Sequence, residues 1–200
     1  MGRTSTARER LVDAAGELIH HRGYNSLGVA EVCARADVRK GSFYHFFESK
    51  QALTVQVLQR YWQTRREEWT TILGSEPPAL ERLEALFRAQ AEAQTLAQRA
   101  AGTVNGCLLA NLALELSTQD DVVRAHLDEI FAEQAALIQD TLDQAAREGT
   151  ITADRATPRT ARSLLAHLEG MVLFAKVAND PAILDDLWPQ SALLLGPLKD

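Results

Sequence analysis

Apolar residues recur at helical spacing through most of the chain, in segments separated by short breaks rich in glycine, proline and polar residues. The two shortest segments lie together in residues 27–47. The first is apolar at the i, i+3, i+4 and i+7 positions of residues 29–36, and the second at i, i+3 and i+4 from Phe43. Stripes this short cannot form a core alone, so they predict two short helices that cross steeply and pack on others. This is the pattern of a helix-turn-helix, spanning residues 28–47.

The second of these helices has two chemically different sides. One side is expected to face the core and carries three aromatic rings, those of Phe43, Phe46 and Phe47. The opposite side carries Lys40, Ser42, Tyr44 and His45. A cation, a hydroxyl, a phenol and an imidazole are suited to contacts with phosphates and base edges. This side is therefore predicted to contact double-stranded DNA, and the alternative is a polar face in contact with solvent.

The other apolar patterns predict longer helices. A first helix, capped by Thr4, Ser5 or Thr6, ends at Gly23. The remaining helices are predicted at 50–73, 79–101, 107–116, 120–148, from Pro158 to about residue 179, and through the apolar residues of 184–195. The predicted fold is all-α with about nine helices. Residues 1–50 would form a three-helix DNA-binding domain, and residues 51–200 a helical effector-binding and dimerisation domain.

The charge distribution agrees with this division. The chain has a net charge of −6, but residues 1–50 carry eight Lys and Arg against six Asp and Glu, a net charge of +2. The remaining 150 residues carry 13 against 21, a net charge of −8. A mildly basic N-terminal part on an acidic body is typical of a small DNA-binding module joined to another domain.

Composition excludes several classes of protein. No apolar run approaches the roughly 20 residues of a membrane span, so no membrane association is expected. The two cysteines are 74 positions apart and have no paired spacing, which argues against a zinc site. They are predicted to be free thiols in a reducing cytoplasm, with Cys33 on the apolar stripe of its helix. We expect no metal and no cofactor.

Specific motifs in the first third of the chain resemble those of the TetR-type transcriptional repressors. They are Gly23-Tyr24, the segment VRKGSFYHFF at residues 38–47, and Lys50. The resemblance covers residues 5–65. It departs from the family at Leu27-Gly28, where a Thr or Ser is usual, so a hydroxyl contact with phosphate is missing there.

The resemblance implies a homodimer that represses transcription from a palindromic operator and responds to a small-molecule effector. The implied DNA contacts are Arg39, Lys40, Ser42, Tyr44 and His45, and Lys50 would bind a phosphate at the start of the next helix. Dimerisation would use the last two helices, where the apolar surface is wider than one neighbouring helix can cover.

The segment CLLANLALEL at residues 107–116 contains the main candidates for effector binding. Cys107, Asn111 and Glu115 are spaced i, i+4, i+8 on a helix expected to be buried on nearly all sides. The Asn-Gly-Cys-Leu motif at 105–108 resembles a subgroup of the family that senses electrophiles. Three interpretations remain open for Cys107: a core thiol, the wall of a non-covalent pocket, or a reactive sensor. Four residues from other helices are further candidates for a pocket, namely Trp62, Trp69, Phe131 and His167.

An enzymatic function is the alternative from a different class. It would be a helical-bundle enzyme with Cys107 as nucleophile and Glu115 or His167 as base. The chain has no Gly-rich phosphate loop, nucleophile elbow or HExxH motif. We therefore expect a ligand-responsive regulator and not an enzyme, with a ligand-independent DNA-binding regulator as the second alternative.

Overall fold

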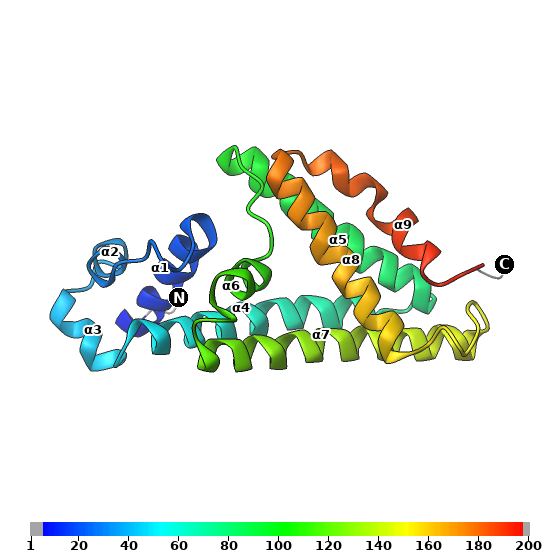
Figure 1. Cartoon of the computed structure of the whole chain (residues 1–200), viewed down its shortest axis with the longest axis horizontal. Helices are drawn as coiled ribbons and strands as arrows, with labels where there is room; N and C mark the ends of the chain where they lie inside the picture. Colours follow the sequence, from blue (N-terminus) through cyan, green and yellow to red (C-terminus); the bar gives the residue numbers. More distant parts are fainter. Residues whose placement is uncertain (1–5, 198–200) are drawn as a thin grey trace. The chain divides into compact units, whose positions relative to one another are not determined.

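The structure, a computed structural model, describes residues 6–197 (Figure 1). The described residues form α-helices and one 3-10 helix, and they contain no strand. The all-α fold predicted from the sequence is therefore confirmed. The elements, in chain order, are α1 (Ala7–Arg22), α2 (Val29–Arg35), α3 (Lys40–Phe46), α4 (Lys50–Leu73), α5 (Ala79–Ala101), α6 (Leu108–Leu116), α7 (Asp121–Glu148), α8 (Pro158–Ala178), the 3-10 helix η1 (Pro181–Asp186) and α9 (Leu187–Leu193).

Local sequence signals fix both ends of α1. The Thr6 hydroxyl accepts a hydrogen bond from the Glu9 amide, and the Glu9 carboxylate accepts one from the Thr6 amide, which is a complete capping box. Gly23 ends the helix with φ 80° and donates its N–H to the Ile19 carbonyl. Thr4 and Ser5, the other predicted caps, lie outside the described residues.

The described chain divides into two compact units. Residues 6–64 and Leu108–Asp128 form the first unit, which contains α1, α2, α3 and α6. Arg65–Cys107 and residues 129–197 form the second, which contains α5, α8, η1 and α9. The helices α4 and α7 begin in the first unit and end in the second. The functional division at residue 50 stays a prediction.

The first unit contains the predicted helix-turn-helix. Its core includes fully buried side chains from α1, α2, α3 and α4, among them Leu11, Ile19, Val32, Phe43 and Leu53. Cys33 is buried with them. Asp37, in the turn between α2 and α3, adopts a left-handed conformation with φ 51°, which Asp tolerates better than most residues. Phe46, expected in the core, is only half-buried.

The second unit is built around α5 and α8. The core contains leucines of both helices with Phe87, and η1 and α9 pack against α5 and α8. Asn179 ends α8 in a left-handed conformation and binds the start of the Gly102–Gly106 segment, since its side chain accepts from the Val104 amide and donates to the Gly102 carbonyl. This anchors the residues that lead to Cys107.

Two predictions about the helices are wrong in detail. The segment 107–116 was expected to be buried on nearly all sides, but Leu114 of α6 is 75% exposed. The last apolar pattern begins as the 3-10 helix η1, because the Asp180 carboxylate accepts the Ala182 amide immediately after Pro181. The helix α9 that follows is therefore short.

Candidate DNA interface and thiol site

The helix α3 presents the predicted polar side chains outward. Phe43 is completely buried and contacts the Tyr44 ring edge-on at a centroid distance of 5.2 Å, whereas Tyr44 itself is 60% exposed. Lys40 and His45 are also exposed, and Ser42 is half-buried. Exposed Arg39 is the N-cap residue of α3. These side chains form one face, to which we refer as the α3 face.

Gly41 lies in the first turn of α3 and is exposed. A Cβ built at this position would have no described neighbour within 4 Å. The fold therefore does not require a glycine here, although glycine weakens a helix by roughly 0.5–1 kcal/mol relative to alanine. Close approach by the backbone of another molecule would explain its presence.

Lys50, at the start of α4, is engaged within the first unit. Its ammonium donates to the Tyr24 carbonyl at 2.9 Å and the Leu27 carbonyl at 3.2 Å, and it lies 3.8 Å from the centre of the Tyr24 ring. Burial lowers the pKa of Lys50, and the Glu115 carboxylate partly offsets this. The ammonium therefore binds the loop between α1 and α2. The predicted phosphate contact of Lys50 stays a prediction.

The same loop is held by α6. The Glu115 carboxylate accepts the backbone N–H groups of Tyr24 and Asn25, each at 2.7 Å. Gly23 faces this carboxylate closely, since a Cβ there would lie 3.0 Å from its Oε2 atom. Glu115, which sequence reasoning assigned to an effector pocket, thus fixes the entry to the helix-turn-helix.

The other candidate effector residues belong to different parts of the chain. Trp62 is buried and Asn111 half-buried in the first unit. Trp69 is buried, and Phe131 and His167 are half-buried, in the second. The Nε2 atom of His167 is buried without a hydrogen-bond partner. Their role in effector binding stays a prediction.

Cys107 immediately precedes α6 and is half-buried. Its thiol hydrogen-bonds the carboxylate of Glu169, from α8. The Glu169 Oε2 atom is fully buried and has no hydrogen-bond partner, although the residue as a whole is half-buried. Burial raises the pKa of Glu169 to about 7, and the hydrogen bond with Cys107 acts in the opposite direction.

Lys176, two helical turns further along α8, is the cationic neighbour of Cys107. Burial lowers the pKa of Lys176, and the negative charge of the Cys107 thiolate acts in the opposite direction. Sequence reasoning missed both Glu169 and Lys176. The available signal was a single carboxylate within an otherwise apolar run, LEGMVLF at residues 168–174.

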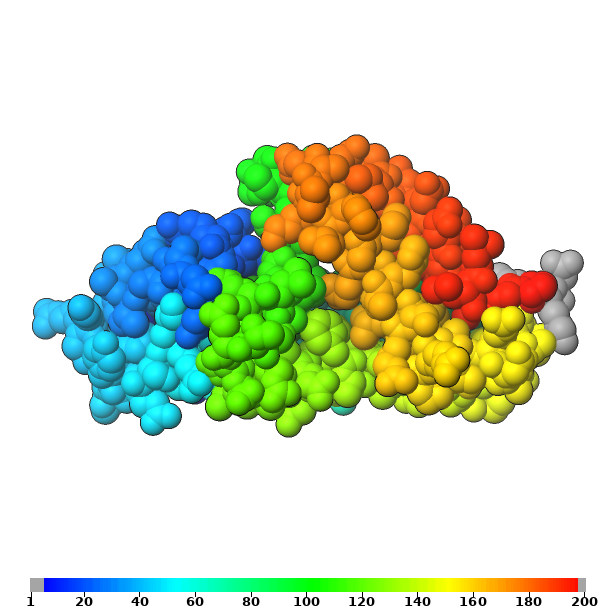
Figure 2. Space-filling model, viewed as in Figure 1, coloured from blue at the N-terminus to red at the C-terminus, as the bar shows by residue number. Residues whose placement is uncertain are grey.

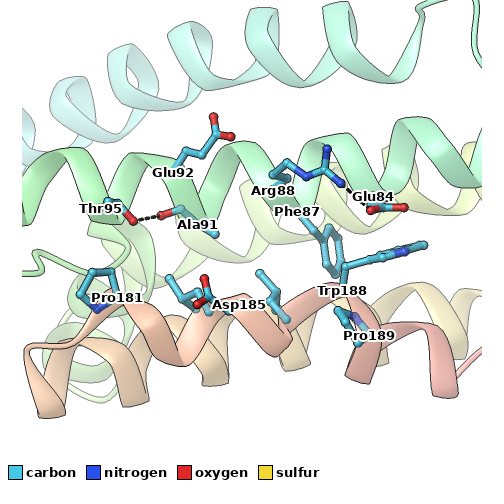
Figure 3. A pocket seen from close by; sticks show the side chains of 12 residues that line it. Glu84, Phe87, Arg88, Ala91, Glu92, Thr95, Pro181, Asp185, Trp188 and Pro189 are labelled. Carbon is cyan, nitrogen blue, oxygen red and sulfur yellow. Dashed lines mark hydrogen bonds and ion pairs between the residues drawn. The ribbon is translucent and has the colours of Figure 1, made fainter.

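The second unit also contains a cavity of about 400 Å³ between α5 and the η1–α9 segment (Figure 3). The rings of Phe87 and Trp188 meet edge-on at 5.8 Å at one end of it. Arg88, on its wall, is paired with Glu84 at 2.6 Å. None of the effector residues predicted from the sequence lines this cavity.

Comparison with known families accounts for both halves of the chain. Residues 11–57 match the family described as "Bacterial regulatory proteins, tetR family", and residues 79–190 match "Tetracyclin repressor-like, C-terminal domain". The chain belongs to the TetR family of transcriptional regulators. The resemblance inferred from residues 5–65 is thereby confirmed, and the family model extends it through the C-terminal body.

Two relatives of this TetR-family chain are named as repressors. The transcriptional repressor DhaR of Mycobacterium sp. (strain GP1) is 34% identical over 92% of this chain and 89% of its own. The transcriptional repressor NemR of Escherichia coli K12 is 31% identical over 86% of this chain and 85% of its own. These relatives are regulators of transcription and not enzymes, which confirms the expectation from the sequence.

Solved TetR-family structures share the fold. A regulatory protein TetR from Rhodobacter sphaeroides superposes with a TM-score of 0.86 at 26% identity, covering 95% of this chain and 99% of its own. The reduced form of E. coli NemR gives a TM-score of 0.82 at 28% identity, covering 95% of this chain and 98% of the NemR chain. No helix among the described residues of our chain is long and apolar enough to cross a membrane.

Proposed function

We propose that this TetR-family protein is a homodimeric repressor that acts in the cytoplasm, binds a palindromic operator through α3, and is released when Cys107 reacts with an electrophile. The α3 face carries the first part of the proposal. It is polar and exposed, and it is supported from behind by a completely buried Phe43.

The α3 face supplies two kinds of contact with DNA. Arg39 and Lys40, at the start of α3, neutralise phosphates and contribute affinity that depends on salt. Ser42, Tyr44 and His45 can contact base edges in the major groove. In a dimer, two such helices would lie in successive major grooves about 34 Å apart, so the operator would be an inverted repeat.

An exposed apolar surface on α8 and α9 supports dimerisation. Leu173, Phe174 and Val177 of α8 are 42%, 65% and 77% exposed, and Leu193 of α9 is 72% exposed. The helix α8, orange in Figure 2, lies at the surface of the second unit. Phe174 and Val177 are spaced i, i+3 on one side of α8, as expected of a surface that packs on a copy of itself.

Cys107 is the proposed sensor because its environment differs from that of an inert core thiol. It is half-buried, hydrogen-bonded to a carboxylate and near a cationic side chain. Cys33, by contrast, is buried in the first unit, where burial raises the pKa of its thiol. The relative NemR has been solved in its reduced form, which is consistent with a thiol-based response.

The helix α6 gives a direct route from Cys107 to the DNA-binding helices. It begins at the next residue, Leu108, and near its end Glu115 holds the amides of Tyr24 and Asn25 just before α2. An adduct that displaces the start of α6 would disturb these bonds. The adduct changes occupancy of DNA only to the extent that it fits the released form better than the bound form.

The first experiment tests operator binding. Purified protein selects duplexes from a randomised pool, and we expect an inverted repeat with half-sites about one helical turn apart. Lys40→Ala should weaken binding to that duplex and lower the salt dependence by about one unit. Enrichment of no sequence, or of a site without an inverted repeat, would contradict the proposed dimeric repressor.

The second experiment tests the sensor with N-ethylmaleimide as the electrophile. The wild-type protein and Cys33→Ser should release the selected duplex and carry an adduct at Cys107. Cys107→Ser should bind the duplex normally and fail to release it. Release of DNA from Cys107→Ser would show that the sensor lies elsewhere.

A further inference from the structure

The carboxylate of Glu169 has two features that its packing does not explain. It is the hydrogen-bond partner of the Cys107 thiol, and its Oε2 atom is buried without any partner. A buried polar atom without a hydrogen bond is unfavourable, because it has lost its contacts with water and gained none in exchange. In native structures such atoms are few, and a role in binding or chemistry is one explanation for them.

We propose that Glu169 is the proton-transfer residue for the reaction of Cys107 with α,β-unsaturated carbonyl compounds. This inference rests on the proposed role of Cys107 as a sensor, and it adds a second reacting group to that site. The thiol loses its proton to the carboxylate oxygen that it hydrogen-bonds. Rotation of the resulting carboxylic acid then presents its O–H at the buried position of Oε2, where it donates to the carbonyl oxygen of the effector.

The reaction needs no further reagent. Glu169 takes the proton from the Cys107 sulfur, and the thiolate forms a C–S bond with the β-carbon of the effector. The π electrons of the C=C bond move to the α-carbon and carbonyl oxygen as an enolate. The proton held by Glu169 is transferred to the enolate, which gives the saturated thioether and restores the carboxylate.

The surroundings of Glu169 suit a group that gains and loses a proton near neutrality. Burial raises its pKa to about 7, so both protonation states are populated at physiological pH. The titratable group that acts on Glu169 is the Cys107 thiol, and the charged neighbour of Cys107 is the Lys176 ammonium. Lys176 can stabilise the thiolate. Its presence does not explain why the Oε2 atom of Glu169 is buried without a hydrogen-bond partner.

A simpler role for Glu169 makes the opposite prediction. If the carboxylate were only a negative charge beside Cys107, it would disfavour the thiolate, and its removal would lower the pKa of the thiol and accelerate every alkylation. If it transfers the proton, its removal slows those reactions in which the effector must be protonated. Two alkylating probes separate these roles.

The test compares Glu169→Gln with wild type by mass spectrometry of the Cys107 peptide. Acrylamide is the unsaturated carbonyl probe. Iodoacetamide is the matched control, because the thiolate displaces its iodide and no proton has to be delivered to the probe. We expect Glu169→Gln to slow acrylamide addition by about 100-fold, the lower end of typical general acid–base effects, and to change iodoacetamide alkylation far less. Glu169→Asp should recover part of the loss, and Glu81→Gln on the exposed side of α5 should behave as wild type.

The pH profile is an independent readout. In wild type, the acrylamide rate should rise through an apparent pKa near 7 and then level off. In Glu169→Gln the apparent pKa of this profile should shift upward, toward the ordinary pKa of a thiol, about 8.5. Circular dichroism and binding of the unmodified variants to DNA show that the fold is retained.

Each outcome decides the proposal. Equal slowing of both probes, or faster alkylation by both in Glu169→Gln, overturns proton transfer by Glu169 and leaves the sensor role of Cys107 intact. Absence of any acrylamide or N-ethylmaleimide adduct at Cys107 in the wild type overturns both proposals. Selective slowing of acrylamide with the upward shift in apparent pKa supports the assignment.

Discussion

The contact between Glu115 and the loop after α1 gives a quantitative prediction about stability. Its carboxylate accepts two backbone N–H groups, those of Tyr24 and Asn25, at 2.7 Å each. The bond to Tyr24 is partly buried and is worth about 1.5 kcal/mol, as expected of a hydrogen bond to a charged group. The bond to Asn25 is exposed and is worth about 0.5 kcal/mol, because water replaces the carboxylate there.

Glu115→Ala should therefore destabilise the protein by about 2 kcal/mol. For a chain of 200 residues this lowers the melting temperature by roughly 4–8 °C. Glu115→Gln keeps one amide oxygen as acceptor, so it should lose about half as much. The mutation should also weaken DNA binding, since the loop leads directly into α2.

Thermal unfolding followed by circular dichroism measures the effect. The matched control is Glu67→Ala, which removes an exposed carboxylate from the second half of α4 and should change stability by less than about 0.5 kcal/mol. If Glu115→Ala melts at the same temperature as this control, then the two hydrogen bonds do not hold the loop and the route proposed from α6 to the DNA-binding helices is wrong.

Two further predictions concern the surfaces proposed for DNA and for the second copy. Gly41→Ala should stabilise the free protein by up to about 1 kcal/mol, because alanine favours a helix and its Cβ has open space. The same substitution should weaken operator binding by about tenfold or more in a fluorescence anisotropy titration. Unchanged binding would mean that DNA does not approach position 41. Phe174→Asp should give a monomer in analytical ultracentrifugation. The ring would be buried in the proposed dimer, and its loss from both halves of a symmetric interface costs about 3–6 kcal/mol, or roughly 10²–10⁴-fold in dimer affinity. Leu96→Asp, which changes an equally exposed apolar residue on α5, is the control and should remain dimeric.

The segment around α3 could be read from the sequence because its signals are local. The apolar spacing that buries Phe43 also places Lys40, Tyr44 and His45 on the exposed side of the same helix. Helical periodicity fixes which residues share a side once the helix forms. The caps at Thr6, Gly23 and Thr157 are also properties of a few neighbouring residues.

Contacts between distant segments could not be read in the same way. The spacing of Asn111 and Glu115 fits their positions one turn apart on α6, whereas Cys107 precedes that helix. Nothing in the spacing shows that Glu115 binds residues 24 and 25. Lys50 resembles a phosphate ligand in sequence, while in the structure its ammonium binds the carbonyls of Tyr24 and Leu27.

The sequence by itself determined the helical fold, the family and the polar face of α3, since periodicity, capping and a short motif are sufficient for each. Only the tertiary structure brought Glu169 to Cys107, because these residues are 62 positions apart on different elements. A hydrogen bond and an unpartnered buried oxygen depend on how helices pack, and packing is set by many side chains at once. The chemistry proposed for the thiol depends on that packing.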